Sequence, residues 1–210
     1  MSHGPPPVPF RDCTGALVAG GRASRLAGVA KGLLLSEGES ILSRSMRLFG
    51  ALFRETLLVV NDAAPYGALQ ARIVADVFPG KGAPGGLHAA LAASRTDWVF
   101  TAACDMPFLA AGPITWLAAR RQGAPAVAVR WQGKVETLHA FWSRGCLPAV
   151  EELLRGGEPS LWAIATAVGA RIVDEEEWRL VDPQGRSFAN ANTPDDAARL
   201  GLTVPPSGAP

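Results

Sequence analysis

Strand-like and helix-like segments alternate along the first half of the chain, and this alternation restricts the fold more than any other feature. The strand-like segments are short apolar runs at residues 14–19, 56–60, 72–75 and 98–103. Helical patterns lie between them at residues 41–53, where Ser40 can cap the helix, just after Pro65 and at residues 87–94. Alternation with short links predicts a parallel sheet that helices cover on both faces.

The second half is less regular. Two strands near residues 126–130 and 137–142, joined at Gln132 and Gly133, predict a small antiparallel insertion. Helices are expected at residues 147–154 and 160–168, a strand at 171–173, and a last helix that Thr193 caps and Pro194 begins. We therefore expect an α/β fold, a three-layer α/β/α sandwich with a mostly parallel sheet. One domain over residues 13–202 would stand between flexible tails at 1–12 and 203–210.

Composition narrows the classes of protein. The 210 residues carry a formal net charge of +1, and 48% are hydrophobic, which suits one well-packed core and gives no general attraction to nucleic acid. No apolar run reaches the ~20 residues that a membrane helix needs, and we expect no signal peptide. The three cysteines (Cys13, Cys104 and Cys146) lie far apart, so a reducing, cytoplasmic setting is expected and any metal should be bound by oxygen.

Polar residues and glycines follow the ends of the predicted strands. They are Gly20, Gly21, Asn61, Asp76 and Asp105. In an open parallel sheet, ligands bind outside the carboxyl ends of the strands, so these residues are expected to share one rim. Backbone N–H groups suit phosphate, polar side chains suit a base or ribose, and a carboxylate suits magnesium. The rim therefore predicts a nucleotide site.

The loop after the first strand is basic and free of acid. It carries Gly20, Gly21, Arg22, Arg25 and Lys31 before any carboxylate appears. Glycines let backbone N–H groups approach an oxyanion, and the cations would neutralise phosphate charge. A tight strand-to-helix turn with solvated cations is the structural alternative. The loop is not a Walker P-loop, because the sequence has no GxxxxGK[ST] motif.

Asp105 is the candidate metal ligand. It follows a strongly apolar strand, and Pro107 stiffens its turn. Magnesium takes one or two carboxylates together with water and substrate phosphates, although Asp105 could also be an ordinary turn residue. Asn61 and Asp76 can each contact a base or ribose or simply form turns.

The segment NANTP places two asparagines before the last helix. Asn192 has a structural alternative, since it or Thr193 can cap that helix, whereas Asn190 has no capping role.

A different motif, GKGAPG at residues 80–85, imitates a dinucleotide-binding loop. Several residues separate its glycines from the preceding strand, and Pro84 removes a backbone donor, so a nicotinamide-dependent oxidoreductase remains only a distant alternative.

Together, four stretches resemble a known family. Within residues 14–200 the chain contains, in this order, LVAGGRASRL with AKGLL, VVND, CDMPF and NANTPDD. They resemble the molybdenum cofactor guanylyltransferases, a MobA-like group within the Rossmann-like nucleotidyltransferases. The resemblance implies a fold of the nucleotide-diphospho-sugar transferase type and transfer of GMP from Mg²⁺-bound GTP to molybdopterin, with release of pyrophosphate.

The resemblance also implies roles for individual residues. Phosphate binding would involve Val18, Ala19, Gly20, Gly21 and Lys31. In the mechanism that we expect from the residues, Lys31 and Arg25 stabilise the leaving pyrophosphate. Asn61 and Asp76 would contact guanine and ribose, and Asp105 would bind both GTP and Mg²⁺. Asn190 and Asn192 would lie toward molybdopterin. Transient contacts with other cofactor-biosynthesis proteins or acceptor molybdoenzymes are also implied, with no role for nucleic acid or membrane.

Two positions depart from the family pattern. Ala30 stands where an aspartate usually precedes the lysine, and Thr137 stands where many members have proline. Loss of the acid at Ala30 could change how Lys31 is held. One alternative is therefore a GTP-binding homologue with impaired catalysis. A related nucleotidyltransferase that uses CTP or another nucleoside triphosphate is a second, independent alternative.

Overall fold

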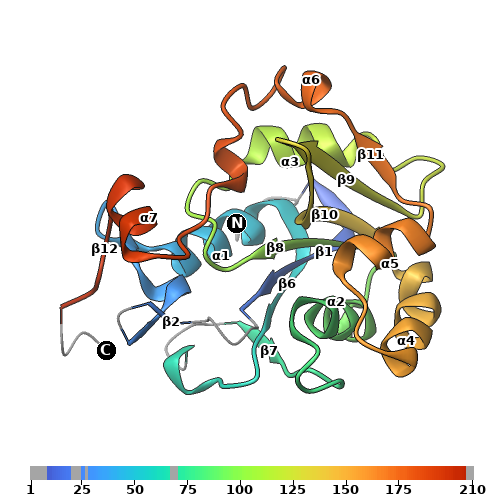
Figure 1. Cartoon of the computed structure of the whole chain (residues 1–210), viewed down its shortest axis with the longest axis horizontal. Coiled ribbons are helices and arrows are strands. Elements are labelled where there is room, and N and C mark those ends of the chain that lie inside the picture. Colours follow the sequence, from blue (N-terminus) through green and yellow to red (C-terminus); the bar gives the residue numbers. More distant parts are fainter. Residues whose placement is uncertain (1–8, 20–24, 27, 67–70, 207–210) are drawn as a thin grey trace, which may run out of the picture.

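A seven-stranded sheet forms the centre of the protein (Figure 1). The computed structural model describes residues 9–19, 25, 26, 28–66 and 71–206. In spatial order the strands are β11 (Arg171–Val173), β9 (Ala126–Trp131), β10 (Lys134–Ser143), β8 (Trp98–Ala103), β1 (Phe10–Val18), β6 (Phe53–Val59) and β7 (Arg72–Val74). β1 pairs in parallel with both β6 and β8, and β6 with β7. The predicted parallel sheet is confirmed.

The predicted antiparallel insertion is confirmed as well. β10 runs antiparallel to both β8 and β9. The turn between β9 and β10 places Gln132 at φ 47° and Gly133 at φ 76°, the left-handed geometry that matches the twist of a tight hairpin. β11 then pairs in parallel with β9 and closes that edge.

Helices cover both faces of the sheet (Figure 1). On one face, Leu17 and Phe100 pack in a core with α1 (Ile41–Leu52) and α3 (Ala111–Ala118). On the other face, Ala16 and Val18 pack in a second core with α2 (Gly82–Ala93), α4 (Leu147–Gly156) and α5 (Leu161–Ala167). The alternation of side chains along β1 separates the two cores, as the three-layer prediction requires.

A smaller unit stands beside the central sheet. Its three-stranded sheet contains β4 (Leu35–Ser36), β5 (Glu39–Ser40) and β12 (Leu202–Thr203), and α7 (Pro194–Arg199) packs beside it. Remaining elements are the hairpin of β2 (Arg25–Leu26) and β3 (Val29–Ala30), the short helix α6 (Glu175–Trp178), and the 3₁₀ turns η1 (Lys31–Leu33), η2 (Ala64–Tyr66), η3 (Arg144–Cys146) and η4 (Arg186–Phe188). None of the described helices combines the length and apolarity needed to cross a membrane.

The structure corrects two predicted boundaries. β1 begins at Phe10 rather than at residue 14, because Phe10 packs against Phe53 and Phe141 with ring centroids 5.7 and 6.4 Å away. Residues 10–12 are therefore part of the sheet and not of a tail. At the other end, Thr203 pairs with Leu35 in the small sheet, so the expected tail cannot begin at residue 203.

Two helices differ from the expectation. α2 begins at Gly82, five residues before the predicted start, although its first turns contain glycines and Pro84. A Cβ at Gly86 would lie 2.6 Å from Val18 Cγ1, so the absence of a side chain allows the helix to lie closely on β1. α3 was not predicted from the sequence, because Gly112 and Pro113 in its first turn resemble a loop.

Candidate active site

Lys31 lies at the centre of a polar network. It follows β3 and begins η1, where Gly32 lies against Cys104: a Cβ at Gly32 would be 3.4 Å from Cys104 Cβ and from its carbonyl oxygen. This close approach brings Lys31 Nζ to 3.4 Å from Asp105 Oδ2. The same Nζ donates a 2.6 Å hydrogen bond to Asn192 Oδ1. Lys31 is only 4% exposed, so its charge is held inside the protein rather than in solvent.

The two asparagines of the NANTP segment belong to this network. Asn192 Nδ2 donates to Asn190 Oδ1 at 3.0 Å, and the Asn192 backbone N–H donates to Asp196 at 3.2 Å. Thr193 is the cap of α7 and forms a capping box with Asp196. The side chain of Asn192 therefore does not cap the helix and is available to Lys31.

Burial changes the proton affinity of Asp105. Burial raises the pKa of its carboxyl, and the nearby Lys31 ammonium opposes that change. Among the described residues, no group of three or more His, Cys, Asp or Glu side chains could hold a metal ion by itself. Asp105 offers one carboxylate, which fits a hard cation that takes its other ligands from phosphate and water.

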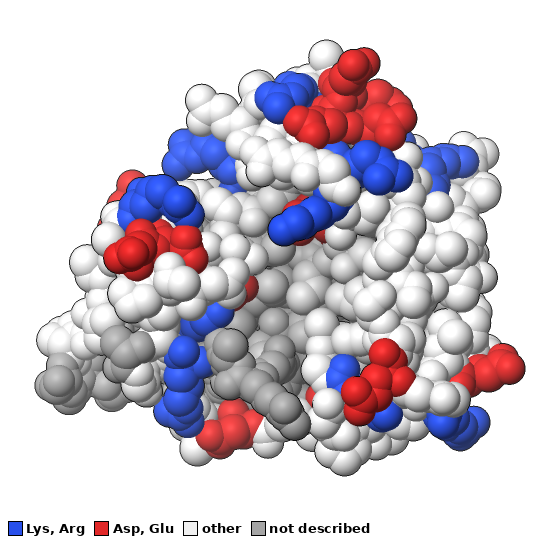
Figure 2. All heavy atoms as spheres, viewed as in Figure 1, with Lys and Arg blue, Asp and Glu red and all other residues white. Residues whose placement is uncertain are grey.

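A cavity of about 660 Å³ opens beside this network. Ala30, the neighbour of Lys31, lines it together with residues that follow several strands. Figure 2 shows the face of the molecule hollowed between the part that carries α7 and β12 and the part that carries α2, α4 and α5, with both charge signs around the margin. The volume suits a small molecule of nucleotide size.

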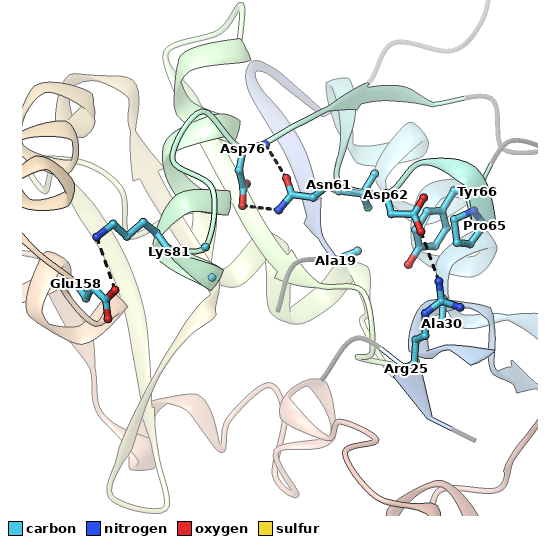
Figure 3. A pocket seen from close by; sticks show the side chains of 13 residues that line it. Ala19, Arg25, Ala30, Asn61, Asp62, Pro65, Tyr66, Asp76, Lys81 and Glu158 are labelled. Carbon is cyan, nitrogen blue, oxygen red and sulfur yellow. Dashed lines mark hydrogen bonds and ion pairs between the residues drawn. The ribbon is translucent and has the colours of Figure 1, made fainter. Parts of the chain in front are cut away.

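Asn61 and Asp76 lie at the middle of the cavity wall (Figure 3). Asn61 follows β6 and Asp76 follows β7, and their side chains meet because the two strands are parallel neighbours. Asn61 Nδ2 donates to Asp76 Oδ2 at 3.0 Å, and the Asp76 backbone N–H donates to Asn61 Oδ1 at 3.0 Å. Burial raises the pKa of Asp76, whereas the hydrogen bond from Asn61 lowers it. The two residues act as one preformed polar unit.

Arg25 lines one end of the cavity from the β2–β3 hairpin. Its guanidinium lies 3.4 Å from Asp62 Oδ2, and both side chains are more than half exposed. Ala19 also lines the cavity, and its N–H donates to the carbonyl of Val59. Val18 is buried under α2, and its carbonyl accepts a hydrogen bond from the Cys104 N–H, so it does not line the cavity. Gly20 and Gly21 lie outside the described residues.

The sequence did not single out several residues of the cavity. They are Asp62, Pro65, Tyr66, Lys81 and Glu158. Tyr66 is buried, and burial raises its pKa to about 12, so it stays neutral and can donate a hydrogen bond. Asp62 follows Asn61 and could have been inferred from the same strand end. Lys81 and Glu158 carry no local signal, because packing of α2 against α4 brings them together.

Other residues considered from the sequence lie in the core. His139 is completely buried, with Phe100, Trp178 and Phe188 around its ring at centroid distances of 5.1–5.4 Å. Cys13, Cys104 and Cys146 are buried free thiols. Seven residues separate β7 from α2, which agrees with setting aside the dinucleotide motif at residues 80–85.

Comparison with known proteins identifies the family of this chain. Residues 15–171 match the MobA-like NTP transferase domain. A Chloroflexus aggregans protein named "Probable molybdenum cofactor guanylyltransferase" is 33% identical over 90% of this chain and 96% of its own length. The molybdenum cofactor guanylyltransferase of Syntrophotalea carbinolica is 30% identical over 86% of each chain.

Solved structures share the fold. Molybdopterin-guanine dinucleotide biosynthesis protein A from Archaeoglobus fulgidus superposes with a TM-score of 0.75 at 24% identity, over 89% of this chain and 96% of that one. Rv0371C from Mycobacterium tuberculosis, solved as a complex with manganese, gives a TM-score of 0.65 at 19% identity, over 90% and 97%. The family match covers most of the chain and the curated relatives nearly all of it, so the chain belongs to the MobA-like NTP transferases, within the group of molybdenum cofactor guanylyltransferases.

Proposed function

We propose that this chain transfers GMP from GTP to the terminal phosphate of molybdopterin and releases pyrophosphate, forming the guanine dinucleotide form of the cofactor. The names of its curated relatives support this reaction. The observation that carries the assignment of roles is the Lys31–Asp105 pair, held at 3.4 Å beside a nucleotide-sized cavity at the carboxyl ends of the strands. The molybdenum-cofactor product would then pass to acceptor molybdoenzymes in the cytoplasm.

The reaction needs alignment and charge stabilisation more than a strong base. The acceptor phosphate is already an anion near neutral pH, so its oxygen can attack the α-phosphorus of GTP directly. The bond from the α-phosphorus to the β-bridging oxygen then breaks, and pyrophosphate leaves. Lys31 would stabilise the developing charge, because its ammonium is buried and held in place by Asp105 and Asn192. Arg25, at the cavity wall, would contact the departing phosphates.

Asp105 would hold a divalent cation, for which we propose Mg²⁺. A structural relative has been solved with manganese, which supports divalent metal use in this fold. When bound, the cation supplies Lewis-acid neutralisation of phosphate oxygens. Asp105 contributes the protein carboxylate, and Lys31 limits its motion. Asn61 and Asp76 would contact guanine and ribose, and Asn190 and Asn192 would face molybdopterin.

Pyrophosphate release tests the proposal directly. The wild-type chain should release pyrophosphate only when GTP, Mg²⁺ and molybdopterin are all present. Asp105→Ala should abolish most of this release, because the protein carboxylate for the cation is lost. Asp174→Ala is the matched control, since Asp174 is an exposed acid that pairs with Arg130 rather than with Lys31. A variant D105A that kept most of its turnover would contradict the assigned role.

Protection from thermal unfolding by GTP, CTP, ATP and UTP, with and without Mg²⁺, identifies the nucleotide. The strongest protection is expected from GTP. Protection mainly by CTP would identify a related enzyme with another donor. Protection by GTP without any pyrophosphate release would support the impaired homologue that Ala30 leaves open, because Ala30 lines the cavity without supplying a carboxylate.

A further inference from the structure

The two ends of the cavity differ in chemistry (Figure 3). Arg25 and Ala30 lie at one end, and Ala30 leads directly to Lys31 and its partner Asp105. The phosphates are therefore expected at that end. Lys81 and Glu158 lie at the opposite end, beyond Asn61 and Asp76, as Figure 3 shows. A nucleotide whose phosphates are near Lys31 would place its base near Lys81 and Glu158.

Packing and hydrogen bonding hold these two residues together. Lys81 immediately precedes α2, and Glu158 lies in the connection between α4 and α5. Lys81 Nζ donates to the Gly157 carbonyl at 2.9 Å and lies 3.9 Å from Glu158 Oε1. Because α2 also packs against α4, the packing of these two helices fixes the positions of the segments that carry Lys81 and Glu158.

Glu158 differs from the other acids of the cavity. Asp62 accepts hydrogen bonds from Arg25 and the Ala64 backbone, and Asp76 accepts one from Asn61. Within the part of the chain that the structure describes, no donor forms a hydrogen bond with the Glu158 carboxylate, and its side chain is 85% exposed. Among the described acids that line the cavity, Glu158 is thus the one with both carboxylate oxygens free of hydrogen bonds.

A carboxylate beside an ammonium complements one base edge in particular. Guanine presents adjacent N1–H and 2-amino donors, which a carboxylate can accept together, and its O6 and N7 atoms accept from a cation. Adenine and cytosine instead place an unprotonated ring nitrogen, an acceptor, where guanine has its N1–H donor, so a carboxylate there would repel them. We propose that Glu158 reads the N1–H and 2-amino edge of guanine and that Lys81 contacts O6 or N7, which makes Glu158 a specificity-determining residue.

This inference rests on the proposed function, and inosine triphosphate separates the two. ITP differs from GTP only in lacking the 2-amino group, so it keeps O6, N7 and the phosphates. The experiment measures the dissociation constants of GTP and ITP with Mg²⁺ by calorimetry for the wild type, Glu158→Gln and Lys81→Met. Glu152→Gln is the matched control, because Glu152 is an exposed acid on α4 that does not line this cavity.

The wild type should bind GTP about tenfold more tightly than ITP, the value of one hydrogen bond to a charged group. In E158Q the affinities for GTP and ITP should differ by no more than about twofold, mostly because GTP binds more weakly. E152Q should keep the wild-type preference for GTP over ITP. K81M should weaken the binding of GTP and of ITP equally, because both bases carry O6 and N7. If E158Q kept the wild-type ratio of GTP affinity to ITP affinity, even with an equal loss of affinity for both ligands, this inference alone would be overturned. A wild type that bound no GTP would overturn the proposed function as well.

Discussion

Lys31 donates a 2.6 Å hydrogen bond to Asn192, although the two residues lie 161 positions apart in the sequence. The bond joins the turn after the β2–β3 hairpin to the segment that precedes α7. With Asp105 at 3.4 Å, the buried ammonium has two oxygen partners from two different parts of the chain. The geometry fixes a positive charge at the rim of the sheet before any substrate is bound, as electrostatic preorganisation requires.

Lys31→Met should lower kcat about 100-fold, with a smaller change in KM for GTP, because the missing charge acts mainly on the transition state. The same variant should lose about 3 kcal/mol of unfolding free energy at pH 7, since Asp105 stays buried without its cation. Steady-state kinetics and urea unfolding measure both effects. Adding Asp105→Asn should restore most of the stability and none of the activity; a double variant as unstable as K31M would contradict the pairing.

Asn192→Ala should lower kcat about tenfold, because Lys31 loses its shorter hydrogen bond and can change orientation. Asn190→Ala is the comparison, since among the described residues the Asn190 side chain forms a hydrogen bond only with Asn192. We expect N190A to raise KM for molybdopterin while leaving kcat within about threefold. Equal loss of kcat in both variants would show that Asn192 does not act through Lys31.

Gly86→Ala should destabilise the protein by about 1–3 kcal/mol, because a Cβ there would lie 2.6 Å from Val18 Cγ1 and force α2 away from β1. GTP affinity should fall too, since the start of α2 lines the cavity. Gly50→Ala is the control: Gly50 lies in α1 with nothing within 4 Å of its Cβ position, so alanine should stabilise by about 0.5–1 kcal/mol. Urea unfolding of both variants checks the prediction, and equal stabilities would contradict it.

Burial lowers the pKa of His139 to about 4, from an ordinary value of 6.5. Between these pH values the unfolded chain binds a proton that the folded protein excludes, so stability should fall by about 1.4 kcal/mol per pH unit as the solution is acidified. Above pH 6.5 His139 is neutral in both the folded and the unfolded chain, so this loss of stability is absent. His139→Leu should remove this part of the pH dependence. Unfolding free energies at pH 7, 6 and 5 test it, and parallel curves for the two proteins would refute the assignment.

The sequence by itself determined the class of fold and the position of several polar residues at the rim. Strand-forming runs and helical periods are local properties, so the alternation predicted the parallel sheet, and the turn at Gln132 and Gly133 predicted the antiparallel hairpin. Polar residues at strand ends, such as Asn61 and Asp76, could be placed at one edge because parallel strands end together. The resemblance of four motifs to a family added the expected chemistry.

Only the tertiary structure decided which of these residues meet. Local propensity cannot reveal that α2 starts at Gly82, because close packing on Val18 outweighs the poor helical tendency of its glycines. Nor can it reveal that Phe10 completes β1 through contacts with Phe53 and Phe141. The position of Glu158 at the cavity likewise depends on tertiary contacts. They are the packing of α2 on α4 and the hydrogen bond from Lys81 to the neighbouring Gly157 carbonyl. Contacts between distant segments depend on how whole faces pack, and no local pattern carries that information.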